Sequence, residues 1–367
     1  MIRILPLLLA VTLCFPYLSY AQVNFGKYTK FEFAPARGET FPIPIRLEKP
    51  ASLEISIFTS DGDLVRTLHT DQALKPGTHT ITWDGKDKDG IIVPDEAYVP
   101  VLKFKLEGGE EQSIDPRDTS GGEVVENLQV QITPTKDIAY FLPVSSRVLI
   151  RLGIKGGPML RSLANWEPRG PGKNVQRWDG RDQNGIMDIR TEKELDIFMM
   201  AFQLPKYSII TTGNKTTDYR AYHQMKGWQN PVVPPEKMVL VKGNRRISRQ
   251  YYFPRTQDAM PRVTLSIPDN LPLSPAGYPQ VKLGQSLLIT VDIVKADRWL
   301  MNESLYEVGF FVDHVFVAEE EQGYVPLSWY WKVHNLTPGR HILTVNISGF
   351  SGKVGVSNLL FEVQKVE

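Results

Sequence analysis

The residues of this 367-residue chain whose types and spacing could do chemistry are a few carboxylates in one glycine-containing loop. Asp87, Asp89 and Glu96 fall at positions three, five and twelve of the EF-hand calcium-loop spacing, with Gly90 at position six. Position one is Gly85 instead of an aspartate, and no helical pattern flanks the loop. The loop is either a calcium site or a plain polar turn. We favour the turn, and we expect no cofactor.

Nucleophiles and metal-binding histidines are not grouped in any familiar pattern. The sequence contains no His-Glu-x-x-His and no Gly-x-Ser-x-Gly elbow. Its one cysteine, Cys14, lies in an N-terminal segment that we expect to be removed. The sequence therefore predicts a protein that is not an enzyme. A hydrolase with an unrecognised site is the alternative that we rank last.

Residues 205–261 combine many lysines and arginines with interleaved aromatic residues. This basic connection is either a surface for an acidic protein or an anionic glycan, or a strap that packs between domains. We favour the strap. If it is a surface, the candidate binding residues are Arg245, Arg246, Arg249, Trp228, Tyr251 and Tyr252. The net charge of the whole chain is only +1, so we expect no nucleic acid as a partner.

Aromatic residues elsewhere suggest a second class of function, glycan binding. Sugar rings stack on exposed aromatic faces, so the hypothesis needs such faces on the surface. The candidates form two groups: Trp329, Trp331, Tyr324 and Tyr330, or Trp228 with Tyr222.

The elements that position these residues are short strands, and part of the pattern occurs twice. Leu64 to Leu68, Pro76-Gly77 and the segment from Trp83 to Gly90 have counterparts 95 residues later, ending in Trp178 to Gly185. Such constant spacing indicates duplication. Trp83 and Trp178 are either core residues or ligand platforms, and we favour the core. We expect Asp84 and Asp179 to bond backbone amides in the turn that follows.

Alternating apolar and polar residues, with 27 prolines and 28 glycines, predict an all-β protein of tandem Ig-like antiparallel β-sandwiches. We expect three such domains, because the chain is too long for one. The expected order is a first sandwich at 22–106, an acidic glycine-rich linker at 107–123, a duplicated second sandwich at 124–204, the basic connection at 205–261 and a divergent third sandwich at 262–367.

Residues 1–21 read as a secretory signal, with Arg3 as the charged end, an apolar run to Leu18 and a small residue at Ala21. A membrane anchor is the alternative, but the apolar run is short and is broken by Pro16. No later stretch is apolar for long enough to cross a bilayer. We therefore expect an exported protein that is periplasmic, on the cell surface or extracellular.

The Val-Arg-Thr-Leu, Pro-Gly and Trp-Asp-Gly pattern resembles the Ig-like domain of the flagellar hook-capping protein, over about residues 50–104. The copy at 147–203 is similar but lacks the turn and tyrosine of Pro94 to Tyr98. The resemblance implies the fold, an envelope location and no catalytic residue. The N-terminal region of the hook protein has no counterpart here, which argues against flagellar assembly. We expect a structural or interaction protein whose partners are other envelope or extracellular proteins.

Overall fold

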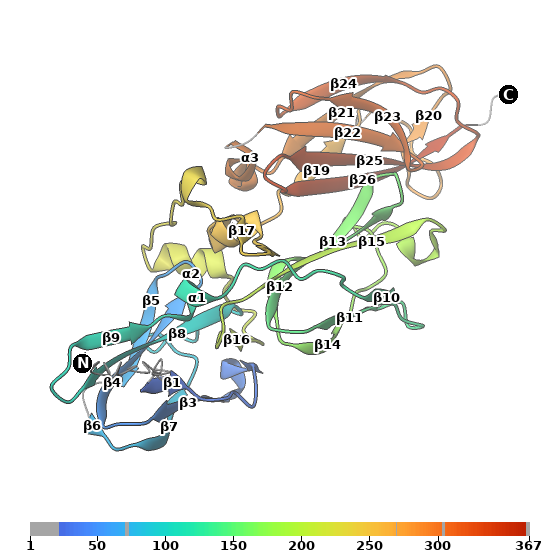
Figure 1. The fold of residues 1–367 in the computed structure, drawn as a ribbon. Helices are drawn as coiled ribbons and strands as arrows, with labels where there is room; N and C mark the ends of the chain where they lie inside the picture. The colour runs from blue at the N-terminus through green and yellow to red at the C-terminus, as the bar shows by residue number, and fades with distance from the viewer. Residues whose placement is uncertain (1–21, 70–72, 269, 303–304, 365–367) are drawn as a thin grey trace, which may run out of the picture.

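The computed structural model describes residues 22–69, 73–268, 270–302 and 305–364, so the predicted signal at 1–21 lies outside it. The described residues form three β-sandwiches that follow one another from the blue to the red end of Figure 1. The all-β Ig-like fold class predicted from the sequence is confirmed. Within the described ranges, no helix has the length and apolarity needed to cross a bilayer.

The first sandwich packs a three-stranded sheet against a larger one. The strand order of the smaller sheet is β1 (Val23–Phe25), β3 (Phe41–Leu47), β7 (Gly77–Trp83). The larger sheet has the order β2 (Glu32–Phe33), β16 (Ile209–Thr211), β8 (Ala97–Leu106), β4 (Ala51–Thr59), β5 (Leu64–His69), with β6 (Ala73–Leu74) beside β4 and β9 (Glu111–Ile114) beside β8. Because side chains alternate across a strand, Ile43, Ile45 and Trp83 point inward and are fully buried.

The second sandwich is smaller and is built around β12. Its first sheet has the order β10 (Val130–Ile132), β11 (Ile138–Leu142), β14 (Gly172–Gln176). Its second sheet has the order β13 (Met159–Arg169), β12 (Ser146–Ile154), β15 (Leu195–Gln203). Val148, Ile150 and Leu152 alternate along β12 and are fully buried between the sheets.

The third sandwich pairs a three-stranded sheet with a five-stranded one. The orders are β19 (Val263–Ser266), β21 (Ser286–Ile293), β24 (Leu327–Lys332), and β20 (Gln280–Val281), β26 (Val354–Val363), β25 (Gly339–Gly349), β22 (Tyr306–Val312), β23 (Val315–Glu320). All these neighbours are antiparallel except β20 and β26. The core includes Ile289, Phe310 and Val345.

The basic connection packs against the first two sandwiches as well as leading to the third. Its strand β16 pairs antiparallel with β8 and parallel with β2, so it completes a sheet of the first sandwich. Its helix α2 (Tyr219–Met225) places Tyr222 in the same core. The connection also contains the hairpin of β17 (Val241–Lys242) and β18 (Arg245–Arg246) and the short helices η3 (Pro235–Lys237), η4 (Arg249–Tyr252) and η5 (Arg255–Gln257). The short helices outside the connection are α1 (Pro116–Thr119), α3 (Trp299–Asn302), η1 (Pro35–Arg37), η2 (Ile189–Thr191) and η6 (Lys295–Asp297).

Candidate functional site

In the first copy, helix α2 packs against the loop after β7 and contacts it through one buried aspartate, Asp87. One carboxylate oxygen of Asp87 accepts hydrogen bonds from the amides of Asp89 and Ile91. The other accepts the Tyr222 hydroxyl at 2.8 Å and lies 2.5 Å from the Lys226 ammonium. Burial raises the pKa of Asp87, but the hydrogen bonds from Lys226, the backbone and Tyr222 outweigh burial and hold that pKa below its usual value.

In the second copy, the equivalent loop contacts the third sandwich instead of a helix. Asp182 is fully buried, and one of its carboxylate oxygens accepts the amides of Ile186 and Met187. The other accepts the side-chain amide of Asn358 in β26 at 2.8 Å. The Asn184 side chain completes the contact by accepting the backbone amide of Asn358 at 2.7 Å. Both copies therefore use the same aspartate as a docking point for a later part of the chain.

The carboxylates of the predicted calcium pattern do not converge on one point. Asp87 and Asp89 both pair with the Lys226 ammonium, which supplies the positive charge at that position. Glu96 belongs to a different cluster, where its two carboxylate oxygens pair with Arg147 and Arg255. The EF-hand spacing is thus not matched by a shared ligand geometry in the folded chain.

A buried charge network joins the first sandwich, the second sandwich and the basic connection. Glu96 is completely buried, and its carboxylate lies 2.6 Å from Arg147 and within pairing distance of Arg255. Burial alone raises the pKa of Glu96, but the two guanidinium groups lower this pKa by more than burial raises it. The net pKa lies below the usual value, so Glu96 is held ionised. Arg255 also lies 3.2 Å from the carboxylate of Asp258.

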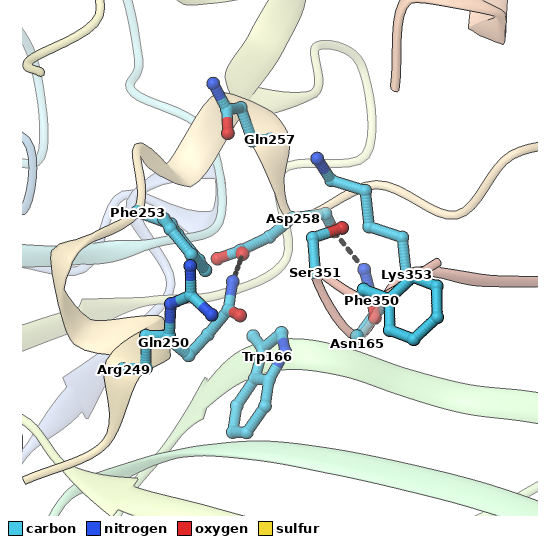
Figure 2. A pocket seen from close by; sticks show the side chains of 11 residues that line it. Asn165, Trp166, Arg249, Gln250, Phe253, Gln257, Asp258, Phe350, Ser351 and Lys353 are labelled. Carbon is cyan, nitrogen blue, oxygen red and sulfur yellow. Dashed lines mark hydrogen bonds between the residues drawn. The ribbon is translucent and has the colours of Figure 1, made fainter. Parts of the chain in front are cut away.

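Asp258 responds to the same surroundings in the opposite direction. Burial raises the pKa of Asp258 to about 7, because Arg255 and Arg147 offset only part of the loss of hydration. Its carboxylate accepts a hydrogen bond from the Gln250 side chain, and its backbone carbonyl accepts one from Asn165 (Figure 2). One cluster therefore contains a carboxyl group held ionised and another that titrates near neutrality.

A β-bulge in β13 directs a backbone carbonyl of the second sandwich toward this network. The β12–β13 register shifts between Val148 and Leu149, which leaves Trp166 as an extra residue with φ of 56°. A bulky residue seldom adopts a positive φ, and bulges commonly redirect neighbouring groups. Here the carbonyl of Trp166 accepts a hydrogen bond from Arg147 at 3.2 Å.

Two cavities lie on either side of Asp258. The first, of about 220 Å³, lies where β13, the basic connection and the loop after β25 meet (Figure 2). Its lining includes Trp166, Arg249, Phe253 and Lys353. The second, of about 200 Å³, lies between the first two sandwiches and the basic connection. These cavities are gaps in an interface between domains.

The arginines proposed as a binding surface are exposed, but each already has a partner. Arg245 lies 2.8 Å from Glu123, and Arg246 lies 3.0 Å from Glu126. Arg249 lies over the ring of Phe253, 5.4 Å from its centroid. Their charge is therefore partly balanced within the protein.

The aromatic residues proposed for the same surface pack against the sandwiches. Trp228 lies edge-on to Tyr222 beside the first core, at 5.5 Å between ring centroids. Tyr251 packs near Phe202 of the second sandwich at 6.1 Å, and the Tyr252 hydroxyl bonds to the backbone of Val239. Trp228 and Tyr251 thus contact different sandwiches, as expected of a strap more than of one binding face. That these six residues bind a partner stays a prediction.

The aromatic groups considered for glycan binding are only partly on the surface. Tyr330 and Tyr324 are 78% and 53% exposed. Trp331 is 5% exposed, and Trp329 packs against Phe310 at 4.3 Å between ring centroids. Tyr222, the partner proposed for Trp228, is completely buried, so neither group forms the exposed platform that the glycan hypothesis requires.

The duplicated tryptophans are not equivalent in the structure. Trp83 is completely buried and donates to the carbonyl of Lys86, which confirms its place in the core. Trp178 lies beyond β14, packs against the edge of the second core and donates to the carbonyl of Lys136; it is only partly buried, so it belongs to the core as predicted but is not equivalent to Trp83. The bulkier first sandwich surrounds its tryptophan, whereas the smaller second one leaves this edge open.

The duplicated turn is reproduced closely. Asp84 and Asp179 accept the amides of Lys86 and Arg181, each at 3.0 Å, as predicted. Each aspartate also pairs at 2.9 Å with an arginine of an earlier strand, Arg66 of β5 or Arg161 of β13. Sequence reasoning missed the network of Glu96, Arg147, Arg255 and Asp258 and the docking of Tyr222 and Lys226. The one available signal was that residues 205–261 carried more charge and aromatic surface than a linker needs.

The similarity of the chain to solved structures is low. These structures include the fibronectin(III)-like modules of Clostridium thermocellum CbhA, with 10% identity, a TM-score of 0.20 and coverage of 93% of this chain and 94% of that chain. A bacterial ice-binding adhesin has 9% identity and a TM-score of 0.19, and covers 94% of this chain and 98% of that chain.

Sequence comparison gives a specific result for the first sandwich. The basal-body rod modification protein FlgD of Salmonella typhimurium is 43% identical over 60 residues, which is 16% of this chain and 25% of that protein. FlgD of Salmonella typhi gives the same values. The chain thus spans about a quarter of the length of these relatives. Residues 34–105 match the family of FlgD Ig-like domains, so the first sandwich of this chain is an Ig-like module of the FlgD type.

Proposed function

We propose that this chain is an exported, non-enzymatic structural or interaction protein, a multidomain scaffold or accessory subunit of a cell-envelope or extracellular assembly. The observation that carries the proposal is that both junctions between sandwiches are closed by buried, directional polar contacts. A string of independent modules would instead be joined by solvated linkers. The match of residues 34–105 to FlgD Ig-like domains supports the general class of an Ig-like structural module.

The first junction depends on the Glu96, Arg147 and Arg255 network. Each residue comes from a different unit: the first sandwich, the second sandwich and the basic connection. Removing one member of a buried ion pair typically costs about 3–5 kcal/mol, because the other charge is left uncompensated. A relative movement of the two sandwiches would carry the same kind of penalty.

The second junction uses asparagine side chains that recognise backbone. The side chain of Asn346 in β25 donates to the carbonyl of Met159 at 2.9 Å and accepts its amide at 2.7 Å. Asn358 binds Asp182 and Asn184 at the duplicated loop. These contacts fix orientation because each partner needs a particular geometry. The three sandwiches therefore form a spacer with a set shape, and this suits a scaffold.

The proposal is tested in the native cell. The full chain carries a photo-reactive phenylalanine analogue at exposed Phe316 or Tyr330, and the chain without residues 1–21 is the matched control. We expect the full chain to be cleaved near residue 21, to leave the cytoplasm, and to cross-link to a small set of envelope proteins. A chain that stays in the cytoplasm, or that gives the same cross-links as the control, would contradict the proposal.

A further inference from the structure

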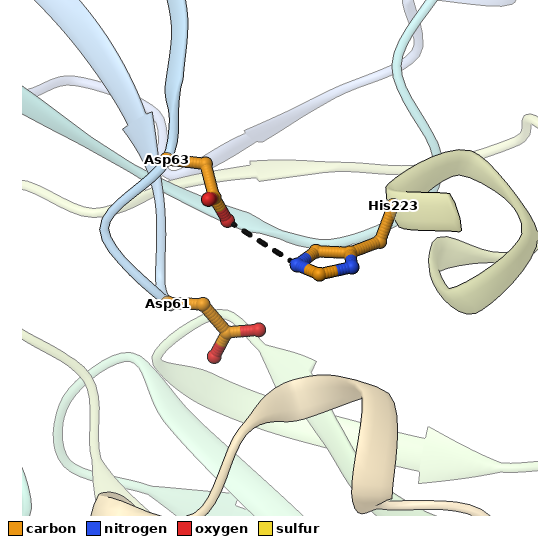
Figure 3. Close-up of side chains that lie close together, drawn as sticks. All are labelled: Asp61, Asp63 and His223. Carbon is orange, nitrogen blue, oxygen red and sulfur yellow. Dashed lines mark ion pairs between the residues drawn. The ribbon is translucent and has the colours of Figure 1, made fainter. Parts of the chain in front are cut away.

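Two carboxylates and one buried histidine meet where helix α2 docks on the first sandwich (Figure 3). Asp61 and Asp63 belong to the hairpin turn between β4 and β5, and His223 lies on α2. We propose that Asp61, Asp63 and His223 form a binding site for a divalent transition metal, zinc by ligand type, which fastens α2 to this turn.

The geometry of the three side chains suits one ion. One potential ligand atom from each residue lies within 4.8 Å of the other two. The Nε2 atom of His223 is 3.6 Å from a carboxylate oxygen of Asp63. Since zinc binds nitrogen and carboxylate oxygen at about 2.0–2.2 Å, two ligands of one tetrahedral ion lie about 3.5 Å apart. The His223–Asp63 spacing of 3.6 Å is close to this value, and the ligand atom of Asp61, within 4.8 Å of the other two, has to move toward them to complete the set.

The buried histidine is the independent sign that a ligand belongs here. His223 is only 3% exposed, and its Nε2 atom has no hydrogen-bond partner among the described residues. At 3.6 Å, the separation from Asp63 is too long for a hydrogen bond. A buried polar atom without a partner is costly, and such atoms call for an explanation such as an ion. Figure 3 shows the imidazole directed toward the two carboxylates.

The groups around the cluster hold the carboxylates in place. The Tyr219 hydroxyl and the Arg255 amide both donate to Asp61, at 2.9 Å. The Thr59 hydroxyl donates to Asp63 at 3.0 Å. Hydrogen bonds of this kind orient metal ligands and are part of most metal sites.

The second copy of the repeat lacks the carboxylates and the helix together. At the matching hairpin positions it has Gly156 and Pro158 in place of Asp61 and Asp63. The two turns keep the same backbone bonds, Gly62 to Thr59 and Gly157 to Ile154, so the difference lies in the side chains. The carboxylates therefore accompany the docking of α2 and are not needed for the turn itself.

The mixture of ligand atoms separates zinc from calcium. Imidazole suits zinc and related transition metals, whereas calcium takes six to eight oxygen ligands. Two carboxylates and one imidazole give zinc three of its usual four ligands and leave one position for water or another group.

Metal binding is measured directly on the purified full-length protein after treatment with EDTA. Zn²⁺ is titrated by calorimetry, and Co²⁺ by the visible absorption that a tetrahedral site produces. We expect one ion per chain, with affinity at least about tenfold lower in His223→Gln and in Asp63→Asn. The matched control is His334→Gln, which removes an exposed histidine of the third sandwich and should bind like the wild type.

Circular dichroism in EDTA shows whether each variant is folded before it is titrated. Limited proteolysis near α2, with and without Zn²⁺, gives a second readout that does not depend on either variant: the metal should slow cleavage of the wild type. A dissociation constant above about 10 μM for both Zn²⁺ and Co²⁺ in the wild type would overturn the site. Wild-type affinity in a folded His223→Gln, or proteolysis unchanged by Zn²⁺, would overturn it equally.

Discussion

The two copies of the duplicated loop share their local structure and differ in what they hold. The backbone amide of Lys88 in the first copy donates to the carbonyl of Val65 in β5. The backbone amide of Gln183 in the second copy donates to the carbonyl of Leu160, the matching residue in β13. The buried aspartate then accepts two or more amides within its own loop in both copies. The main difference lies at its outer oxygen, which binds a lysine and a tyrosine in one copy but an asparagine side chain, besides the Asn184 amide, in the other.

This difference shows that the repeated loop is a general docking site, here called a socket, whose buried aspartate (Asp87 or Asp182) binds a later segment of the chain. Its own backbone amides hold the aspartate in position, so the free carboxylate oxygen is presented ready for a partner. The chemistry of the partner then determines the contact. The charged pair of Asp87 and Lys226 holds a short helix, whereas the neutral contact of Asp182 and Asn358 holds a strand of the next sandwich.

The largest difference between the copies is expected for their tryptophans. Trp83→Ala should lower the free energy of unfolding by about 3–5 kcal/mol, because a fully buried aromatic side chain leaves a cavity. Trp178→Ala should cost about half as much or less, since this side chain lies at the edge of its core and part of its surface is already in water. Urea unfolding followed by circular dichroism measures both. Equal costs would show that the two positions are equivalent after all.

The sequence predicted what depends on neighbours along the chain. Alternation along β3 and β12 identified core faces, and the turn bonds of Asp84 and Asp179 are local, since each aspartate reaches an amide two residues away. The pairing of Arg255 with Glu96 spans 159 residues, and no pattern in either segment specifies it. The start of α2 was within reach, because Asp218 caps its first turn by accepting the amide of Ala221. The burial of its inner face depends on a sandwich formed by distant residues.

The sockets themselves should differ in a way that depends on charge. Asp87→Asn keeps an oxygen for the loop amides but leaves Lys226 without its closest anion, so we expect a cost of about 2–3 kcal/mol. Asp182→Asn places one amide group against that of Asn358, with an expected cost of about 1–2 kcal/mol. Hydrogen exchange should locate the first effect at α2 and the second at β26. Exchange that changes equally at both places would argue against two independent sockets.

The network between the two copies should make stability depend on pH in a definite direction. Because the pKa of Asp258 is raised from about 4 when unfolded to about 7 when folded, the folded protein binds more protons between these values. Stability must therefore fall as pH rises from about 4 to 7, until Asp258 is ionised beside Arg255, Arg147, Glu96 and Gln250. The lowered pKa of Glu96 acts the other way and only at more acidic pH.

Melting temperatures of the wild type and Asp258→Asn between pH 4 and 7 measure this effect. We expect the wild type to lose several degrees relative to the variant across this range, because asparagine cannot ionise. Parallel melting curves for the two proteins would show that Asp258 keeps one charge state throughout.

The smallest effect is expected where the basic connection is exposed, in contrast to its buried Arg255. Replacing Arg246 and Arg249 by serine should lower the free energy of unfolding by less than about 1 kcal/mol for each residue, because Arg246 and its partner are exposed and Arg249 only overlies a ring. Arg245→Ser should cost somewhat more, because its partner Glu123 is buried. Arg255→Met is the matched comparison and should cost several times more, since it removes one of the two cations paired with the buried Glu96 and the cation beside Asp258. If these exposed arginines also bind an acidic partner, capture of that partner from envelope extract should weaken with salt and be lost in the triple variant, while the melting temperature stays nearly constant. Capture that is equal for the wild type and the triple variant at low and high salt would leave the basic connection with its packing role alone.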